Sequence, residues 1–253
     1  MTGKSQTKVS IITGAGGGIG RECARALAAR GGSLVLVDIA PDALDRLSDE
    51  LTSANPQMDV LCLPLNVCSE SDMGKMVQAS VDRFGQIDHL VAAAGILRLG
   101  KALKAVSETT LDEWDVVMRT NLTGTFLANR AVLPVMLERR AGDIVNISST
   151  SGRQGRPFDG PYCASKFGII GLSESLAEEV SAYGIRVQTV LPDAVDTPLW
   201  EQNPSSAMRP AHALPPERVA ALVVYLLELP RDTYLLNPVI APLKTRRKGR
   251  RNQ

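Results

Sequence analysis

Short apolar runs alternate with amphipathic patterns along most of the chain. Runs rich in Val, Ile and Leu predict strands at residues 8–13, 34–38, 60–65, 87–92, 143–148, 185–191 and, more weakly, 233–240. Between them, apolar residues recur at the three- and four-residue spacing of helices, which predicts helices at residues 19–30, 41–53, 70–84, 108–139, 161–183 and 215–229. We expect the helix over 108–139 to bend near Pro134, because proline removes a hydrogen bond from a helix interior.

This alternation predicts the fold class. Strands that are apolar on both faces, separated by helices, are typical of a parallel sheet with helices on both sides. The sequence therefore predicts a doubly wound α/β sheet of about seven strands, whose ligand binds beyond the carboxyl ends of the strands. We expect one domain over residues 1–243, followed by a basic tail over residues 244–253.

Composition narrows the class of protein. Apolar residues make up 44% and charged residues 22% of the 253 positions, which is typical of a globular domain. No apolar run reaches the roughly 18 residues that span a bilayer, and the start lacks the apolar core of a signal peptide, so we expect a cytoplasmic protein with no membrane span. Four cysteines without CxxC spacing and only two histidines predict neither a metal site nor a disulfide framework.

The small net charge conceals a basic end. The formal charge is +1, yet the last ten residues contain six basic side chains and no acidic one. We expect a solvated, disordered segment and no nucleic-acid partner, since such ends are usually solvated. Contact with nucleic acid or an anionic membrane surface is the alternative.

A glycine-rich turn joins the first strand to the first helix. Gly14, Gly18 and Gly20 let the backbone approach a pyrophosphate, while the helix N-terminus offers free N–H groups. A flexible loop without a ligand is the alternative, but a strand–turn–helix context favours dinucleotide binding.

Asp38 indicates which dinucleotide binds. It ends the second strand, about 20 residues beyond the turn, where a carboxylate accepts hydrogen bonds from the adenosine ribose. It would repel a 2′-phosphate, and no Arg or Lys lies between Gly14 and Gly20 or next to Asp38. The sequence therefore predicts NAD as the cofactor, with NADP less favoured.

Tyr162 and Lys166 form the candidate catalytic pair. Residues four apart share one face of a helix, and a lysine cation beside a phenol, together with the charge of nicotinamide, lowers the tyrosine pKa. Such a tyrosine exchanges a proton with a carbonyl or alcohol oxygen. Ser149 follows the fifth strand and can donate a hydrogen bond to the same oxygen. These residues predict an oxidoreductase that transfers a hydride between nicotinamide and a carbonyl or alcohol carbon.

Together, residues 13–20, Asn121, Ser149, Tyr162 and Lys166 resemble the short-chain dehydrogenase/reductase family over residues 8–197. The resemblance implies a Rossmann-type fold, Tyr162 as acid/base, Ser149 as substrate orienter, and Lys166 as a ribose ligand that lowers the tyrosine pKa. It implies that Asn121 holds a water linking Lys166 to solvent, and that the protein is a homo-oligomer, a dimer or tetramer. It also implies further cofactor contacts from Ile19, Asn66, Val67, Ala93, Gly95, Pro192, Val195 and Thr197.

Several positions depart from the family pattern. Ala92 and Ala93 replace two asparagines, Asn66 replaces an acid, and the usual C-terminal Asp-Gly-Gly is absent. Asp193 replaces a glycine, and its side chain can crowd the nicotinamide or reach the substrate. The departures at Ala92, Ala93 and Asp193 favour one alternative, an NAD(H)-binding sensor or scaffold with little catalysis.

Apolar residues of the segment 198–213, a candidate lid, predict a small, fairly apolar substrate. Packing of this segment against the body or another subunit is the alternative. Arg98, Arg153 and Arg156 could instead meet an anionic group, or lie exposed without a partner. The residues expected around the substrate are Leu97, Arg98, Ser151, Gln154, Arg156, Phe158, Asp193, Leu199, Trp200 and Met208.

Overall fold

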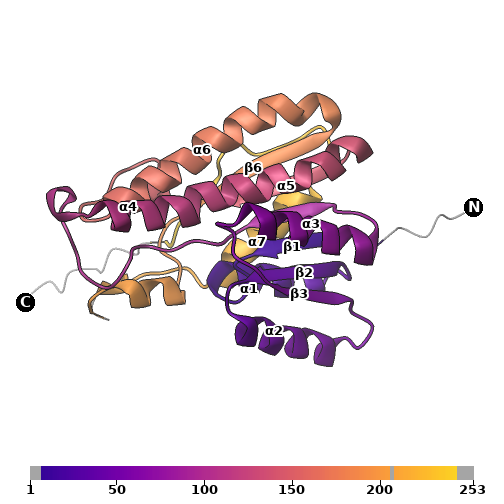
Figure 1. Cartoon of the computed structure of the whole chain (residues 1–253), viewed down its shortest axis with the longest axis horizontal. Helices are drawn as coiled ribbons and strands as arrows, with labels where there is room; N and C mark the ends of the chain where they lie inside the picture. Colours follow the sequence, from indigo (N-terminus) through magenta and orange to yellow (C-terminus); the bar gives the residue numbers. More distant parts are fainter. Residues whose placement is uncertain (1–6, 206–207, 244–253) are drawn as a thin grey trace, which may run out of the picture.

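A seven-stranded parallel sheet forms the centre of the molecule, as predicted (Figure 1). The computed structural model describes residues 7–205 and 208–243. The strand order is β3-β2-β1-β4-β5-β6-β7. The strands are β1 (Val9–Thr13), β2 (Ser33–Asp38), β3 (Val60–Pro64), β4 (His89–Ala92), β5 (Gly142–Ile147), β6 (Ile185–Pro192) and β7 (Val239–Ile240).

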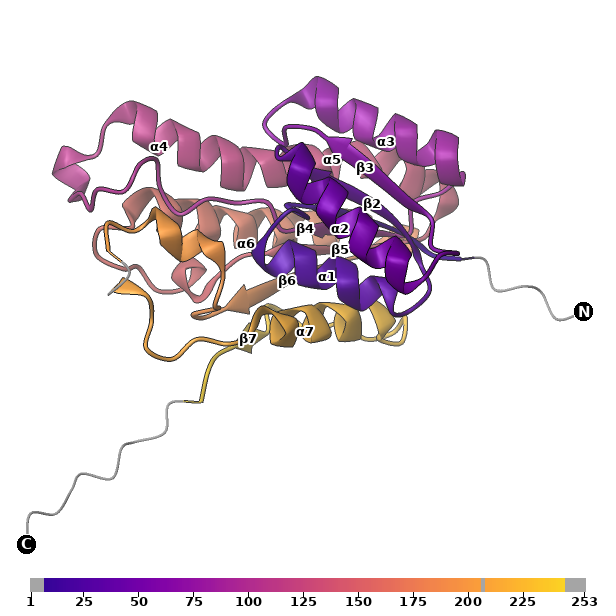
Figure 2. The same ribbon diagram turned by 90° about the horizontal axis from the view of Figure 1, so that it is seen from below.

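Two helical layers cover the sheet. The helices are α1 (Gly18–Ala28), α2 (Pro41–Ala54), α3 (Glu70–Phe84), α4 (Leu111–Met118), α5 (Gly124–Arg139), α6 (Gly160–Val180) and α7 (Pro216–Glu228). One buried cluster joins the sheet to α1, α2 and α7, and a second joins it to α3, α5 and α6 (Figure 2). Ile11 and Ile12, neighbours on β1, belong to opposite clusters because successive strand residues point to opposite faces. The sheet is therefore buried on both sides.

The strand order reverses between β1 and β4, and this reversal opens the site. The two strands pair in parallel and end level, with Thr13 opposite Ala92. The chain leaves β1 toward α1, and it leaves β4 toward α4 and α5. Helices α1 and α5 cover opposite sides of the sheet. Such a divergence leaves a crevice beyond the carboxyl ends of the strands.

The helix predicted over residues 108–139 is interrupted. A π-helical segment, Arg119–Thr123, separates α4 from α5, and α5 continues past Pro134. The irregularity therefore lies at residues 119–123 and not near Pro134. The buried Asn121 explains the position of the π-helical segment, because its side chain hydrogen-bonds the backbone of Ile96 in the loop after β4. Single π-turns within helices are frequent at functional sites.

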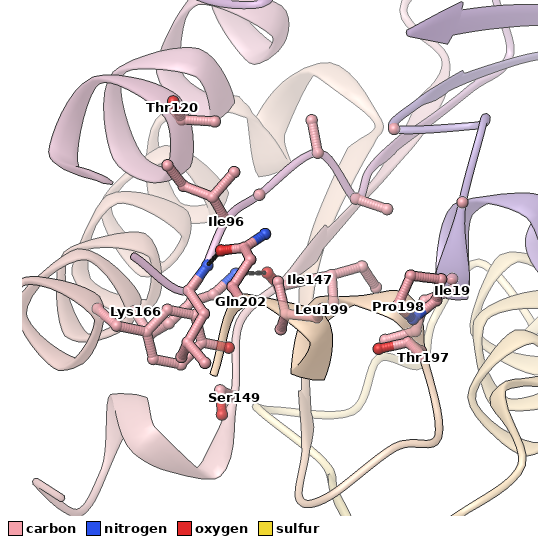
Figure 3. A pocket seen from close by; sticks show the side chains of 18 of the residues that line it. Ile19, Ile96, Thr120, Ile147, Ser149, Lys166, Thr197, Pro198, Leu199 and Gln202 are labelled. Carbon is pink, nitrogen blue, oxygen red and sulfur yellow. Dashed lines mark hydrogen bonds between the residues drawn. The ribbon is translucent and has the colours of Figure 1, made fainter. Parts of the chain in front are cut away.

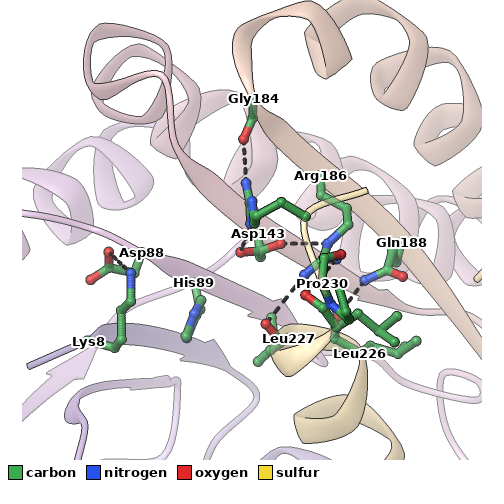
Figure 4. A network of polar contacts seen from close by, with 12 residues as sticks. Lys8, Asp88, His89, Asp143, Gly184, Arg186, Gln188, Leu226, Leu227 and Pro230 are labelled. Carbon is green, nitrogen blue, oxygen red and sulfur yellow. Dashed lines mark hydrogen bonds and ion pairs between the residues drawn. The ribbon is translucent and has the colours of Figure 1, made fainter. Parts of the chain in front are cut away.

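The last strand is much shorter than predicted, because side chains of β6 bind the preceding segment. Figure 4 shows Arg186 beside Pro230 and Leu227. Arg186 donates hydrogen bonds to the carbonyls of Leu229, Pro230 and Thr233, and the Gln188 amide oxygen accepts one from the Leu235 N–H. These backbone groups are then not available for a strand ladder. Only residues 239–240 pair with β6.

Other sequence expectations can be compared with the described residues. None of the helices in the described ranges is long and apolar enough to cross a membrane. Cys23, Cys62, Cys68 and Cys163 are all free thiols. The predicted basic tail, residues 244–253, lies outside the described residues. The candidate lid begins with a short 3-10 helix, Pro198–Gln202.

Candidate active site

A cleft of about 610 Å³ lies at the carboxyl ends of the strands. This volume is within the usual range for ligand sites, about 300–1,000 Å³. Most of the predicted site residues line it: Gly14, Gly18, Ile19, Asp38, Asn66, Val67, Ala93, Gly95, Ser149, Tyr162, Lys166, Pro192, Val195 and Thr197. Figure 3 shows Ser149 and Lys166 on one side of the cleft and Ile19 and Thr197 on the other.

The glycine turn presents an open helix N-terminus to this cleft. Gly14 and Gly18 have φ angles of 71° and 46°, which favour glycine. A Cβ on Gly14 would lie 2.7 Å from the Ala94 nitrogen, so glycine permits the close approach of the two loops. The first turn of α1 has neither a side-chain cap nor an acidic residue. Its free N–H groups and positive dipole end suit a phosphate.

Asp38 is held firmly at the same edge. Its Oδ2 accepts a hydrogen bond from the Gly16 N–H at 3.0 Å, and its Oδ1 accepts one from the Ala40 N–H at 3.1 Å. The carboxylate keeps further lone pairs, because each oxygen can accept more than one hydrogen bond. The glycine turn and Asp38 thus fit the phosphates and the adenosine ribose of a dinucleotide.

Two predicted residues, Gly20 and Asn121, support the cleft without lining it. A methyl group on Gly20 would collide with the Gly14 carbonyl oxygen, so this glycine lets α1 pack against the turn. The Asn121 amide donates to the Ile96 carbonyl at 2.9 Å and to Ser165 Oγ at 3.0 Å. Its oxygen accepts from the Ile96 N–H at 2.8 Å. Asn121 therefore fixes the loop after β4 against α6.

The three candidate proton-transfer residues meet where β5 ends and α6 begins. Ser149 Oγ accepts a hydrogen bond from the Ser151 N–H at 3.0 Å, which fixes its position. Lys166 Nζ donates to the Ile147 carbonyl at 2.9 Å and lies 5.6 Å from the centre of the Tyr162 ring. The pair shares one face of α6, as its spacing predicts.

Burial dominates the titration of this group of residues. It raises the pKa of Tyr162 to about 12, against an opposing hydrogen bond with Ser149. It lowers the pKa of Lys166 to about 8. The protein's own groups therefore raise the tyrosine pKa, because desolvation of a phenolate outweighs the favourable contacts. The lowering expected from Lys166 together with the charge of nicotinamide stays a prediction.

Two ion pairs lie near the start of α6, and they involve two of the arginines considered above. Arg98 Nη2 lies 2.5 Å from Asp159 Oδ1, and Arg156 Nη2 lies 2.7 Å from Asp193 Oδ1. Burial raises the pKa of Asp159, with Arg98 opposing that rise. For these two arginines the alternative of an exposed side chain without a partner is wrong, because each pairs with an aspartate.

The candidate lid is tied to the loop after β4. Gln202 Oε1 accepts hydrogen bonds from the N–H groups of Leu97 at 2.8 Å and Arg98 at 3.1 Å (Figure 3). The Trp200 indole donates to the Val195 carbonyl at 2.7 Å. This segment therefore closes one wall of the cleft.

The predicted substrate residues divide into two groups. Leu97, Ser151, Arg156, Asp193, Leu199 and Trp200 line the cleft, whereas Arg98, Gln154, Phe158 and Met208 are not among its lining residues. Asp159 and Gln202 also line it and were not predicted. Asp159 immediately precedes α6 and belongs to no motif. Gln202 lies in the candidate lid, and the prediction for that segment rested only on its apolar residues.

Comparison with known proteins identifies the family. The family model described as short chain dehydrogenase matches residues 8–207. The chain belongs to this family. It is therefore a nicotinamide-dependent oxidoreductase that transfers a hydride.

Relatives of this short-chain dehydrogenase include several reductases. It is 34% identical to 3-oxoacyl-[acyl-carrier-protein] reductase FabG from Thermotoga maritima, over 92% of this chain and 95% of the relative. It is also 34% identical to levodione reductase from Leifsonia aquatica, over 93% and 92%. The solved structure of an actinorhodin polyketide ketoreductase with NADPH has a TM-score of 0.84 and 31% identity, over 94% and 97%. None of these relatives supports the alternative of a sensor or scaffold.

Proposed function

We propose that this enzyme prefers NAD(H) and interconverts a carbonyl and an alcohol group, with Tyr162 as acid/base. The observation that carries this proposal is the meeting of Asp38, Ser149, Tyr162 and Lys166 in one cleft. The glycine turn supports cofactor binding at one end of that cleft. The tyrosine group supports proton transfer at the other end.

Asp38 supports the choice of NAD(H). Its carboxylate, fixed by two backbone N–H groups, would accept a hydrogen bond from a ribose hydroxyl and would repel a 2′-phosphate. The ketoreductase relative was solved with NADPH, so coenzyme choice has to be argued for this chain from its own residues. Ile39, which follows Asp38, is 72% exposed and offers no positive charge to a phosphate.

The chemistry is proposed as follows for the direction of reduction. Reduced nicotinamide supplies the hydride when it is bound. Tyr162, which its raised pKa keeps protonated at neutral pH, donates its hydroxyl proton to the substrate carbonyl oxygen. Ser149 donates a hydrogen bond to the same oxygen and orients it. The Lys166 cation stabilises the phenolate that remains, and oxidation runs through the same groups in reverse.

Asn121 has a positioning role in this proposal. Both N–H donors of its amide are used by Ile96 and Ser165, so the side chain is already anchored on two sides. The water that the resemblance implies would donate a hydrogen bond to the remaining lone pair of the Asn121 amide oxygen. A cytoplasmic location, a homo-oligomeric state and a fairly apolar substrate stay predictions of the sequence.

The coenzyme is tested by fluorescence titration of the purified protein with NADH and NADPH. We expect NADH to bind about tenfold or more tightly, since loss of a charged hydrogen bond typically costs about 1.5–3 kcal/mol. Asp38→Asn should narrow that difference, because the repulsion of a 2′-phosphate is removed. Tighter binding of NADPH by the wild-type protein would contradict this part of the proposal.

The acid/base is tested with Tyr162→Phe in a panel of ketones and secondary alcohols. We expect turnover to fall by about 100-fold or more, the usual size of a general acid contribution. The dissociation constant of NADH should change little, because the phenyl ring still fills the site. Full turnover by the phenylalanine variant would exclude Tyr162 as the proton donor.

A further inference from the structure

The proposed mechanism leaves unused a charged cluster beside Tyr162. Its members are Arg98, Arg156, Asp159 and Asp193, joined as the two ion pairs described above. Each arginine is matched by one aspartate, so their formal charges cancel. We define these four residues as the charged cluster.

Arg156 is the member that offers free hydrogen-bond donors to the cleft. Its Nη2 is fixed by Asp193 Oδ1 at 2.7 Å and by Thr150 Oγ1 at 3.1 Å. Its Nε and Nη1 have no partner among the described residues. The side chain is 38% exposed and lines the cleft. It is therefore a guanidinium held at one corner, with donors left for a ligand.

Arg98 does not share this property. Its side chain is only 12% exposed, and it is not among the residues that line the cleft. Its Nε and Nη1 are buried without a partner in the described part of the chain, so a substrate does not reach them. Within the charged cluster, the available donors belong to Arg156.

Arg156 lies close to the reacting position. Its backbone N–H donates to Cys163 Sγ at 3.3 Å, and Cys163 is the neighbour of Tyr162 on α6. Arg156 and Tyr162 also line the same cleft, and the positive charge of Arg156 opposes the rise in the pKa of Tyr162. A substrate whose carbonyl meets Tyr162 therefore shares the cleft with the guanidinium.

We propose that Arg156 binds a second oxygen of the substrate and so selects neutral carbonyl compounds that carry another carbonyl oxygen, such as keto esters and diketones. This inference rests on the proposed function and names the substrate class of the same site. The guanidinium donates to the second oxygen while Tyr162 and Ser149 donate to the first. Arg156 thereby fixes which of the two carbonyl carbons is reduced.

Charge explains why the second oxygen belongs to a neutral group. Asp159 and Asp193 line the same cleft, so a carboxylate bound by Arg156 would lie next to an aspartate. Like charges in a partly desolvated site repel strongly. The ion pair with Asp193 therefore leaves the free N–H donors of Arg156 able to bind a neutral oxygen. It also cancels the attraction of the guanidinium charge for anions.

The first test compares two substrates with the same enzyme. Ethyl 3-oxobutanoate has the second carbonyl oxygen, and 2-heptanone, of similar length, lacks it. We expect Arg156→Met to lower kcat/KM for the ester relative to the ketone by about tenfold or more, as for loss of a charged hydrogen bond. The ratio cancels any loss of folded enzyme, because both substrates meet the same preparation.

Arg153→Met is the matched control. Arg153 lies three residues away, donates to the Asn237 carbonyl at 3.3 Å, and is not among the lining residues of the cleft. We expect this variant to keep the wild-type ratio of the two kcat/KM values. An active Arg156→Met enzyme with the wild-type ratio overturns the inference and leaves the proposed function intact.

The second test concerns charge. We expect the wild-type enzyme to use the anion 3-oxobutanoate less well than its ethyl ester, and Asp193→Asn to narrow this difference, because Arg156 then keeps its net charge. Equal use of anion and ester by the wild-type enzyme, unchanged by Asp193→Asn, overturns the selection for neutral substrates. A wild-type protein that binds coenzyme but reduces no ketone in the panel contradicts the proposed function itself.

Discussion

Lys166 is a buried cation with little compensation from its surroundings. The residue is 6% exposed, and within residues 7–205 and 208–243 its ammonium group donates to one carbonyl, that of Ile147. Burial lowers its pKa to about 8 from the usual value for lysine. The charge to which the proposed mechanism assigns a role in catalysis therefore destabilises the folded protein near neutral pH.

This cost predicts a pH-dependent gain in stability for Lys166→Met. Between a folded pKa of about 8 and an unfolded value near 10.4, the unfolded wild-type chain binds more protons, so its stability rises with pH. We expect the variant to be about 3 kcal/mol more stable at pH 7, with the gain shrinking toward pH 10. Urea unfolding of both proteins at several pH values measures this difference in the free energy of unfolding.

The exposed Lys75, on α3, provides the control for that comparison. Lys75→Met should differ from the wild type by less than about 1 kcal/mol, because exposed ion pairs contribute little. A Lys166→Met variant whose stability gain is the same at pH 7 and pH 10 would show that the lysine does not lose its charge in this range.

Single residues also show what could be predicted from the sequence. The contact of Tyr162 with Lys166 follows from helical spacing alone. The ion pairs of Arg98 and Arg156 join residues 61 and 37 positions apart. No local pattern relates such positions, because their meeting depends on the path of the loops after β4 and β6.

At the scale of elements, the packing of α1 on the glycine turn decides the geometry of the cofactor end. Gly20 lies inside α1, where a side chain would strike the carbonyl of Gly14. The strands and this turn were predictable, because apolar runs and glycine spacing are local signals. The π-helix at residues 119–123 and the short β7 were not, because tertiary hydrogen bonds of Asn121 and Arg186 produce them.

We expect Gly20→Ala to destabilise the protein by about 1–3 kcal/mol, the usual cost of overpacking, and to weaken NADH binding. The matched control is Gly74→Ala on α3, where an added methyl meets nothing within 4 Å. That variant should gain about 0.5–1 kcal/mol from helix propensity. Thermal unfolding and NADH titration of both variants compare them. Equal unfolding temperatures and equal NADH affinities of the two variants would contradict the predicted collision.

At the scale of the whole molecule, charge pairs at the amino ends of the strands hold distant segments together. Arg186 pairs with Asp143 at 2.8 Å, and Arg231 approaches the other oxygen of Asp143 at 2.7 Å (Figure 4). Lys8 and Asp88 form a further pair at 3.1 Å between β1 and β4. These contacts lie at the opposite ends of the strands from the cleft, so they serve stability and not chemistry.

Arg186→Met should therefore lower the free energy of unfolding by about 3 kcal/mol or more, since it breaks a buried pair and leaves several carbonyls unpaired. At temperatures where the variant stays folded, we expect kcat close to that of the wild type. Arg30→Met, at an exposed pair with Glu228, should cost less than about 1 kcal/mol. Comparable losses from the two variants would rule out a special role for Arg186.

The reversal of strand order between β1 and β4 divides the recognition tasks between two stretches of chain. In the proposed function, residues from Gly14 to Asp38 provide the phosphate and adenosine end of the cleft, whereas residues from Ser149 to Gln202 include the proton-transfer group and one wall. A change inherited in one stretch can therefore leave the other intact. Descendants of such a chain are free to acquire new substrates while keeping their coenzyme, and grafting residues 33–45 from a relative would exchange the coenzyme alone.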